Sequence, residues 1–249
     1  MTSTMLLQAT GLVKRYPGKA QPAVDHIDLQ LQRGDLLGLL GPNGAGKTTT
    51  ISMLATMLRP DAGSIEIAGI DALSNPQLVR PKIGIVPQDL ALYHTLTLRE
   101  NLTFWGRMYG LHGNALAQRI QECIHFVGLS DCLDSCINTF SGGMKRRANL
   151  ATGIIHQPEL VFLDEPTVGI DPQSRYSIIE NLRELNRQGV TMVYSSHYMD
   201  EVEQLCSQVM IVDNGKTVVS GKASQLLLNS GCSGLEQLFL QLTGKKLRD

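Results

Sequence analysis

The chain has 249 residues, of which 43% are hydrophobic, and this is enough for one substantial domain or two modest ones with a packed core. Its 22 Lys and Arg side chains against 23 Asp and Glu give a formal net charge of −1, so we exclude nucleic acid as a main partner. No apolar run reaches the ~18 to 20 residues that span a bilayer, and residues 1–5 lack the features of a signal peptide, so we expect a cytoplasmic protein.

The first predicted elements are two strands of different kinds. Apolar and polar side chains alternate over residues 27–32, which is typical of an antiparallel strand with one buried face. Residues 36–40 are continuously apolar, as in a parallel strand that is buried on both faces. We therefore expect an antiparallel sheet beside a parallel one.

A phosphate-binding loop follows the second strand. The sequence Gly41-Pro42-Asn43-Gly44-Ala45-Gly46-Lys47-Thr48 matches the pattern G-x-x-x-x-G-K-[ST] between a strand and a helix. Glycines let the backbone turn its N–H groups toward phosphate oxygens, and the helix adds its positive end. We expect Lys47 to reach the β- and γ-phosphates and Thr48 to bind Mg²⁺. A glycine-rich turn without a ligand is the weaker interpretation.

After the loop, the sequence again predicts one antiparallel strand and one buried parallel strand. Ile65 and Ile67 alternate with polar residues after a turn at 61–63, and residues 83–86 form a second buried run. Residues 92–148 differ, because they hold the helical stretches 98–108 and 115–127 and no convincing strand. We predict an inserted helical subdomain there.

Within this insert, Ser141-Gly142-Gly143-Met144-Lys145 lies far along the chain from the phosphate loop. It opens a helix, so its backbone N–H groups and the Ser141 hydroxyl offer an anion site. The basic side chains of residues 145–147 are interpreted as a solvated helix face in preference to a nucleic-acid patch.

The last third of the chain predicts a β-α-β unit and a hairpin. Residues 160–163 and 192–194 are two more buried runs, and between them Ile178, Ile179, Leu182 and Leu185 recur at helical spacing. Asn214-Gly215 predicts a hairpin between residues 209–212 and 217–219. Beyond it, Leu235, Leu238, Phe239 and Leu242 form an apolar helix stripe, interpreted as packing on the core rather than as a partner surface.

The predicted fold class is therefore α/β, with a phosphate-loop (RecA-like) parallel sheet core, an added antiparallel β subdomain and an inserted α-helical subdomain. We predict a single domain over 1–249, in which 1–91 and 149–225 form the core and 92–148 the insert, with a helical tail at 226–249.

Polar residues follow the predicted parallel strands at the edge where such sheets bind ligands. Gln88 follows residues 83–86, Asp164 and Glu165 follow 160–163, and His197 follows 192–194. We expect Asp164 to hold Mg²⁺ and Glu165 to orient and deprotonate the attacking water. A carboxylate pair that only caps a turn is the weaker alternative.

The other candidate side chains are weaker signals when each is taken alone. Gln88 can offer its amide oxygen to Mg²⁺ and its N–H₂ to water, although most loop glutamines are only solvated. His197 can donate to the γ-phosphate or to the water, and Tyr16 can stack on a purine, although both residue types are more often structural or merely exposed. The five cysteines form no C-x-x-C pair and are interpreted as reduced thiols, not metal ligands.

Taken together, these motifs resemble the nucleotide-binding subunits of ABC transporters over essentially residues 4–225. The matching segments are 41–49 (Walker A), Gln88 (Q-loop), 140–144 (signature), 160–165 (Walker B), Asp171 (D-loop), His197 (H-loop) and Tyr16 (A-loop). The match includes Thr49 and departs at Met144, where the commoner signature has Gln.

The resemblance implies ATP and Mg²⁺ as cofactors and a second copy of the chain as partner. Each ATP would lie between the phosphate loop of one copy and Ser141, Gly142 and Gly143 of the other, with Asp171 at the same interface. The homodimer would lie on the inner face of the cell membrane beneath integral membrane permease subunits that the insert grips.

Met144 and the segment 238–244, followed by 245–249, resemble the ABC-2 type exporters related to daunorubicin-resistance pumps. The alternative is a soluble ABC ATPase outside transport, such as an iron–sulfur assembly component. A phosphate-loop kinase would leave Ser141 and His197 without roles.

Overall fold

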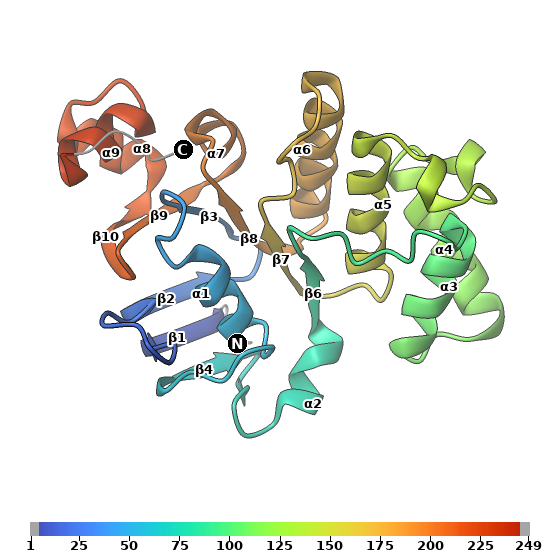
Figure 1. Ribbon diagram of the computed structural model, residues 1–249, viewed down its shortest axis with the longest axis horizontal. Coiled ribbons are helices and arrows are strands. Elements are labelled where there is room, and N and C mark those ends of the chain that lie inside the picture. Colours follow the sequence, from blue (N-terminus) through green and yellow to red (C-terminus); the bar gives the residue numbers. More distant parts are fainter. Residues whose placement is uncertain (1–4, 245–249) are drawn as a thin grey trace.

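The computed structural model describes residues 5–244, in which the strands form two sheets (Figure 1). The six-stranded sheet has the order β10-β9-β3-β8-β7-β6, and all its strands are parallel except the edge strand β10. The strands are β3 (Leu36–Leu40), β6 (Ile83–Val86), β7 (Leu160–Asp164), β8 (Thr191–Ser196), β9 (Gln208–Asp213) and β10 (Lys216–Lys222). The predicted α/β fold with a parallel core is confirmed.

Two strands of this sheet depart from prediction. β9 forms the expected hairpin with β10, but it also pairs in parallel with β3 and so belongs to the core sheet. β8 extends past the apolar run to include Ser195 and Ser196, which are 0% and 2% exposed. Buried serines are tolerated at a strand end when their hydroxyls are hydrogen-bonded, as both are here.

The second sheet is antiparallel and has the order β2-β1-β4-β5. Its strands are β1 (Met5–Lys14), β2 (Val24–Gln32), β4 (Ala62–Ile67) and β5 (Ile70–Asp71). The helix α1 (Lys47–Leu54) lies between the two sheets (Figure 1), and its Ile51, Met53 and Leu54 are buried in the apolar core that both sheets share. This packing fixes the start of α1, where the phosphate loop ends.

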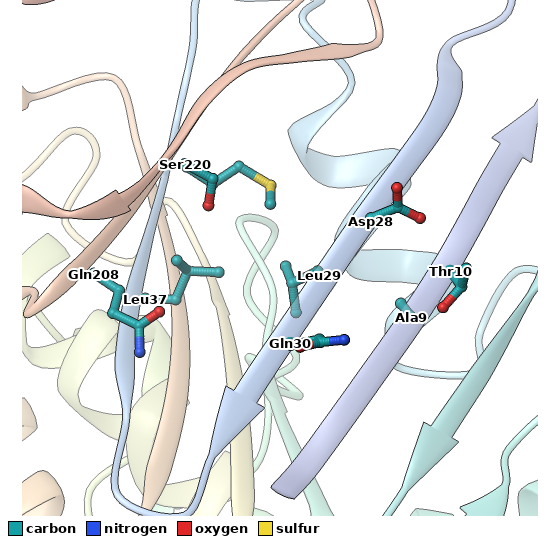
Figure 2. A pocket seen from close by; sticks show the side chains of 9 residues that line it. Ala9, Thr10, Asp28, Leu29, Gln30, Leu37, Gln208 and Ser220 are labelled. Carbon is teal, nitrogen blue, oxygen red and sulfur yellow. The ribbon is translucent and has the colours of Figure 1, made fainter. Parts of the chain in front are cut away.

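A groove of about 450 Å³ lies between the two sheets, and no residue of that loop lines it. Figure 2 shows side chains of β1 and β2 facing those of β3, β9 and β10 across it. It is lined by Ala9, Thr10, Asp28, Leu29, Gln30, Leu37, Gln208, Met210 and Ser220.

The helical insert lies at one end of the molecule (Figure 1). It follows the short helices α2 (Pro76–Val79) and η1 (Arg80–Lys82), and it contains α3 (Leu98–Met108), α4 (Gly113–Phe126), η2 (Ser130–Cys132), η3 (Ile137–Thr139) and α5 (Gly142–Ile154). The Thr97 side chain accepts the N–H of Glu100, whose carboxylate accepts the Thr97 N–H, and this capping box starts α3 at the predicted residue. The boundary predicted at residue 148 falls inside α5, which continues from the insert into the core.

The remaining helices are α6 (Pro172–Arg187), α7 (Met199–Leu205), α8 (Ala223–Ser230) and α9 (Leu235–Thr243). Leu235, Leu238 and Phe239 of α9 are buried in the core cluster, whereas Leu242 is 44% exposed. The stripe of the tail therefore packs on the core, at the end opposite the insert (Figure 1). The segment 245–249 of the exporter resemblance lies outside the described residues.

The basic residues at the start of α5 are not the solvated face that the sequence suggested. Arg146 and Arg147 are only partly exposed, because both guanidinium groups donate to backbone carbonyls. Arg147 Nη1 lies 3.0 Å from the carbonyl oxygens of both Val127 and Gly128, at the end of α4. The Arg147 side chain thus holds the end of α4 against α5.

Replacing Arg147 with methionine is expected to destabilise the fold by about 1–3 kcal/mol, because two carbonyls lose a charged donor while the aliphatic stem remains. For a chain of this size, each kcal/mol lowers Tm by about 2–4 °C, which calorimetry would measure. Lys145→Met is the control, because it replaces another basic side chain of the same helix with methionine. Equal Tm losses in the two variants would contradict the role given to Arg147.

Candidate active site

The phosphate loop packs against Ala23, the residue directly before β2. Gly46 has a φ of +104°, and a Cβ there would lie 2.4 Å from the carbonyl oxygen of Ala23. Any side chain would therefore be strained by its backbone and would collide with Ala23. The next residue, Lys47, begins α1, so the loop N–H groups and the helix N-terminus face the same space.

The Lys47 ammonium lies at the centre of the site. Its Nζ is 2.8 Å from the Gly41 carbonyl oxygen, 3.3 Å from that of Pro42 and 3.2 Å from Glu165 Oε1. The side chain is only 5% exposed, so these oxygens are what stabilises the buried charge. A phosphate oxygen that enters the loop would compete with Glu165 for this ammonium.

Glu165 joins the loop to the end of β8. Its carboxylate lies between Lys47 and His197, whose Nδ1 is 3.2 Å from Glu165 Oε2. Its φ is +46°, a left-handed conformation that is unusual for a non-glycine residue and is typical of functional sites. The backbone N–H of Glu165 donates to Ser195 Oγ at 3.0 Å, which helps to hold this turn.

Ser195 is a site residue that the sequence did not indicate. Its hydroxyl donates to Asp164 Oδ1 at 2.6 Å while it accepts the N–H of Glu165. One buried hydroxyl therefore orients both acidic residues. Because the apolar run ended at Tyr194, only the pairing of β7 with β8 could identify this serine, which lies opposite Asp164.

The phosphate loop, Gln88 and Glu165 line one cavity of about 360 Å³. Its lining residues are Ala23, Asn43, Gly44, Ala45, Gly46, Lys47, Thr48, Thr49, Gln88 and Glu165. The structure thus brings together residues of the loop and of two other strand ends, as the sequence predicted. Asp164 and His197 adjoin the cavity through Ser195 and Glu165.

Gln88 is exposed, and its backbone carbonyl accepts a hydrogen bond from Arg146. Arg146 also donates to the Val168 carbonyl at 3.3 Å, and burial lowers the pKa of its guanidinium. This side chain therefore ties α5 to the Gln88 loop and to the loop that follows Glu165. These contacts could not be predicted from the sequence, because both acceptors are backbone atoms.

Tyr16 lies at the rim of the phosphate loop. β1 ends at Lys14, so Tyr16 lies just beyond the strand, whereas an exposed strand residue is the more common interpretation of such a tyrosine taken alone. Tyr16 is 41% exposed, and its hydroxyl is 3.4 Å from Thr49 Oγ1. An exposed aromatic face beside the loop can stack on a base.

Ser141, Gly142, Gly143 and Asp171 lie at two adjacent helix starts, away from the chain's own phosphate loop. Ser141 caps α5 by accepting the Met144 N–H at 3.2 Å, and Asp171 caps α6 by accepting the Ser174 N–H at 2.9 Å. A Cβ on Gly143 would lie 2.0 Å from Ser174 Oγ, so the two helices meet too closely for any side chain. The hydrogen bond from the Ser174 N–H lowers the pKa of Asp171.

The five cysteines are free thiols, as expected, and all lie within the described residues. Burial raises the pKa of Cys123 to about 11, so this thiol stays protonated and unreactive. Within residues 5–244, no helix is both long enough and apolar enough to span a membrane.

The sheet, the phosphate loop after β3 and the acidic residues at the end of β7 define a phosphate-loop nucleotide-binding protein. A family model for the ABC transporter domain matches residues 24–168. The chain belongs to the ABC transporter family as one of its ATP-binding subunits, which are ATPases coupled to transport.

Curated relatives match most of the chain. The linearmycin resistance ATP-binding protein LnrL of Bacillus subtilis is 47% identical over 94% of this chain and 78% of its own length. The daunorubicin/doxorubicin resistance ATP-binding protein DrrA of Streptomyces peucetius is 40% identical over 93% of this chain and 70% of its own length.

Solved structures agree with the fold. An ATP-binding subunit of an ABC transporter superposes with a TM-score of 0.86 at 29% identity, over 96% of this chain and 99% of that one. A dimeric ATP-binding cassette with bound ADP and phosphate has a TM-score of 0.80 at 23% identity, over 87% of this chain and 98% of that one, and shows the fold alone.

Proposed function

We propose that this chain hydrolyses ATP in a head-to-tail homodimer that drives an ABC-2 type exporter of small molecules. The observation that carries this proposal is the cluster of Lys47, Glu165 and His197 beside the phosphate-loop cavity. The drug-resistance names of its relatives support export over the alternative of a soluble iron–sulfur assembly ATPase.

In the proposed site, the backbone N–H groups of residues 41–48 and the Lys47 ammonium bind the phosphates, and Tyr16 stacks on the adenine. Thr48, Gln88 and Asp164 offer oxygen atoms, which are the ligands that Mg²⁺ prefers. The first two line the cavity, and one Asp164 oxygen is oriented by Ser195. Mg²⁺ held by these oxygen atoms would supply positive charge that offsets the negative charge of the phosphates during the reaction.

Glu165 is the proposed general base. It takes a proton from the water whose oxygen attacks the γ-phosphorus, while the bond to the bridging oxygen breaks and ADP leaves. Lys47 turns from Glu165 Oε1 to the phosphates, and His197 turns its ring N–H from Oε2 to the γ-phosphate or to the water. The geometry supports these roles because Lys47 Nζ and His197 Nδ1 each lie 3.2 Å from an oxygen of the Glu165 carboxylate.

The second copy would complete each site. Ser141, Gly142 and Gly143 present backbone N–H groups at a helix start, and Asp171 lies beside them at the start of α6. A two-fold axis that places these helix starts over the partner's ATP makes ATP part of the interface. Hydrolysis then loosens the dimer.

We further propose that integral membrane permease subunits dock at the junction between the core and the insert, for which 92–148 remains the working division. An apolar hollow of about 250 Å³ lies there, next to the Gln88 loop. It is lined by Met57, Ile85, Pro87, Ala91, Trp105, Tyr109, Thr152 and Gly153. A permease helix seated in it would hold the chain on the inner face of the cell membrane.

Met57→Glu is expected to weaken binding to the permease by at least about tenfold, because a carboxylate would be buried in an apolar contact. Met57 is 65% exposed, so folding and ATP binding should persist. The effect is measured by co-expressing the chain with an ABC-2 type permease of about six membrane spans and comparing how much of each variant co-purifies with it. Leu228→Glu on α8, where Leu228 is 82% exposed, is the control. Normal co-purification of Met57→Glu would refute docking at this hollow.

A further inference from the structure

Glu201 is a buried acidic residue that the proposed mechanism does not yet use. It lies in the first turn of α7, four residues after His197, and it is only 6% exposed. A buried carboxylate is costly unless hydrogen bonds and a positive charge compensate for its lost hydration. The identity of its partners therefore indicates what it does.

Three hydroxyl groups converge on Glu201 Oε2. Thr167 Oγ1 donates to it at 2.8 Å, Ser196 Oγ lies 3.3 Å away, and the Tyr194 hydroxyl also donates. Tyr194 is fully buried, and burial followed by the charge of Glu201 raises the pKa of its phenol. The phenol thus remains a donor at physiological pH.

The other oxygen of Glu201 faces a cation. Arg175 Nε lies 3.2 Å from Glu201 Oε1, but the N–H is not aligned with that oxygen, so the two form an ion pair without a hydrogen bond. The Arg175 guanidinium also lies 4.6 Å from the ring centroid of Tyr198. The Tyr198 ring is in turn 4.1 Å from the ring of His197.

These partners come from the two segments that carry the proposed catalytic groups. Thr167 follows Glu165 by two residues, and Arg175 lies one turn beyond Asp171 in α6. Tyr194 and Ser196 end β8 just before His197, and Ser196 Oγ also accepts the Tyr198 N–H at 2.9 Å. One carboxylate therefore joins the Glu165–Asp171 loop to the His197 loop.

We propose that Glu201 is a positioning residue for ATP hydrolysis, because its carboxylate holds the His197 loop against the loop that carries Glu165 and Asp171. The inference rests on the proposed function, since His197 and Glu165 must act on ATP for their alignment to matter. Glu201 itself is not among the residues that line the phosphate-loop cavity.

The test is Glu201→Gln, which keeps the size of the side chain and one acceptor oxygen but removes the charge opposite Arg175. The expected result is a kcat about 10–100-fold lower, the effect of a misplaced catalytic group, with an ATP Kd within about threefold of the original. Glu203→Gln on the same helix is the matched control, because Glu203 caps the start of α9 and is expected to leave kcat unchanged. Tyr194→Phe removes one donor without changing charge and should lower kcat less.

A double-mutant cycle separates positioning from a general structural effect. If Glu201 acts through His197, adding Glu201→Gln to His197→Ala should lower the single-turnover rate by less than about twofold. An equal loss in both backgrounds, an unchanged kcat, or a loss that appears only in ATP Kd would overturn the inference. Absence of ATP hydrolysis by the unmodified chain would instead overturn the proposed function, and this inference with it.

Discussion

Replacing Glu165 with glutamine is expected to slow ATP hydrolysis by about 10²–10⁴-fold, because the group that accepts the proton from water is removed. ATP should still bind, since the phosphate loop and Thr48 are unchanged. The Lys47 ammonium also loses a charged competitor that lies 3.2 Å away, which favours its contact with phosphate. The variant should therefore accumulate as an ATP-bound dimer.

Two measurements check this expectation. Steady-state phosphate release gives the loss in turnover, and light scattering with and without ATP gives the oligomeric state. Glu184→Gln on α6 is the matched control, because the Glu184 side chain is 47% exposed and pairs with Arg187 and Gln188 on its own helix. Normal turnover by Glu165→Gln, or an ATP-loaded variant that stays monomeric, would refute the roles given to this residue.

The strands that the sequence predicted are those with an unbroken pattern. Residues 36–40 and 160–163 are buried on both faces of the parallel sheet, and their apolar runs follow directly from that burial. β1 was not predicted, because register shifts between Met5 and Leu7 and between Ala9 and Leu12 break its alternation. Period-two patterns detect regular strands and miss bulged ones.

The site residues also fall into those that the sequence predicts and those that it does not. Gln88, Glu165 and His197 could be predicted because the ends of parallel strands meet at one edge of a sheet, so chain position alone implies proximity. Ser195, Arg146 and Glu201 could not, because their roles depend on contacts with segments distant in the sequence or on backbone acceptors. Such contacts leave no local periodicity in the sequence.

The close packing of α5 on α6 means that the starts of both helices must meet the partner together in the proposed dimer. Because a Cβ on Gly143 would lie 2.0 Å from Ser174 Oγ, the starts of these two helices are held together by their packing. Ser141 and Asp171, the two helix caps, should therefore reach a partner copy as one unit. Their own phosphate loop does not include them in its cavity.

Ser141→Arg should consequently damage the ATP site of the partner and spare the site of its own chain, because the added bulk would enter the space that the partner's ATP occupies. We combine it with Lys47→Ala, which removes the ammonium from the chain's own phosphate loop. A dimer with Ser141→Arg in one chain and Lys47→Ala in the other should keep a single intact site. A dimer of the doubly substituted chain with an unmodified one should keep none.

Occluded ATP, counted in doubly tagged dimers that also carry Glu165→Gln, distinguishes the two arrangements without depending on turnover. If Ser141 served its own phosphate loop, the outcomes would be reversed: the split dimer would trap no ATP, and the doubly substituted chain would leave its partner's site intact. Ser141→Ala separates bulk from capping, since losing the cap alone costs about 1 kcal/mol of helix stability. Partial occlusion by Ser141→Ala, with none at the blocked site of Ser141→Arg, would attribute the damage to the added side chain.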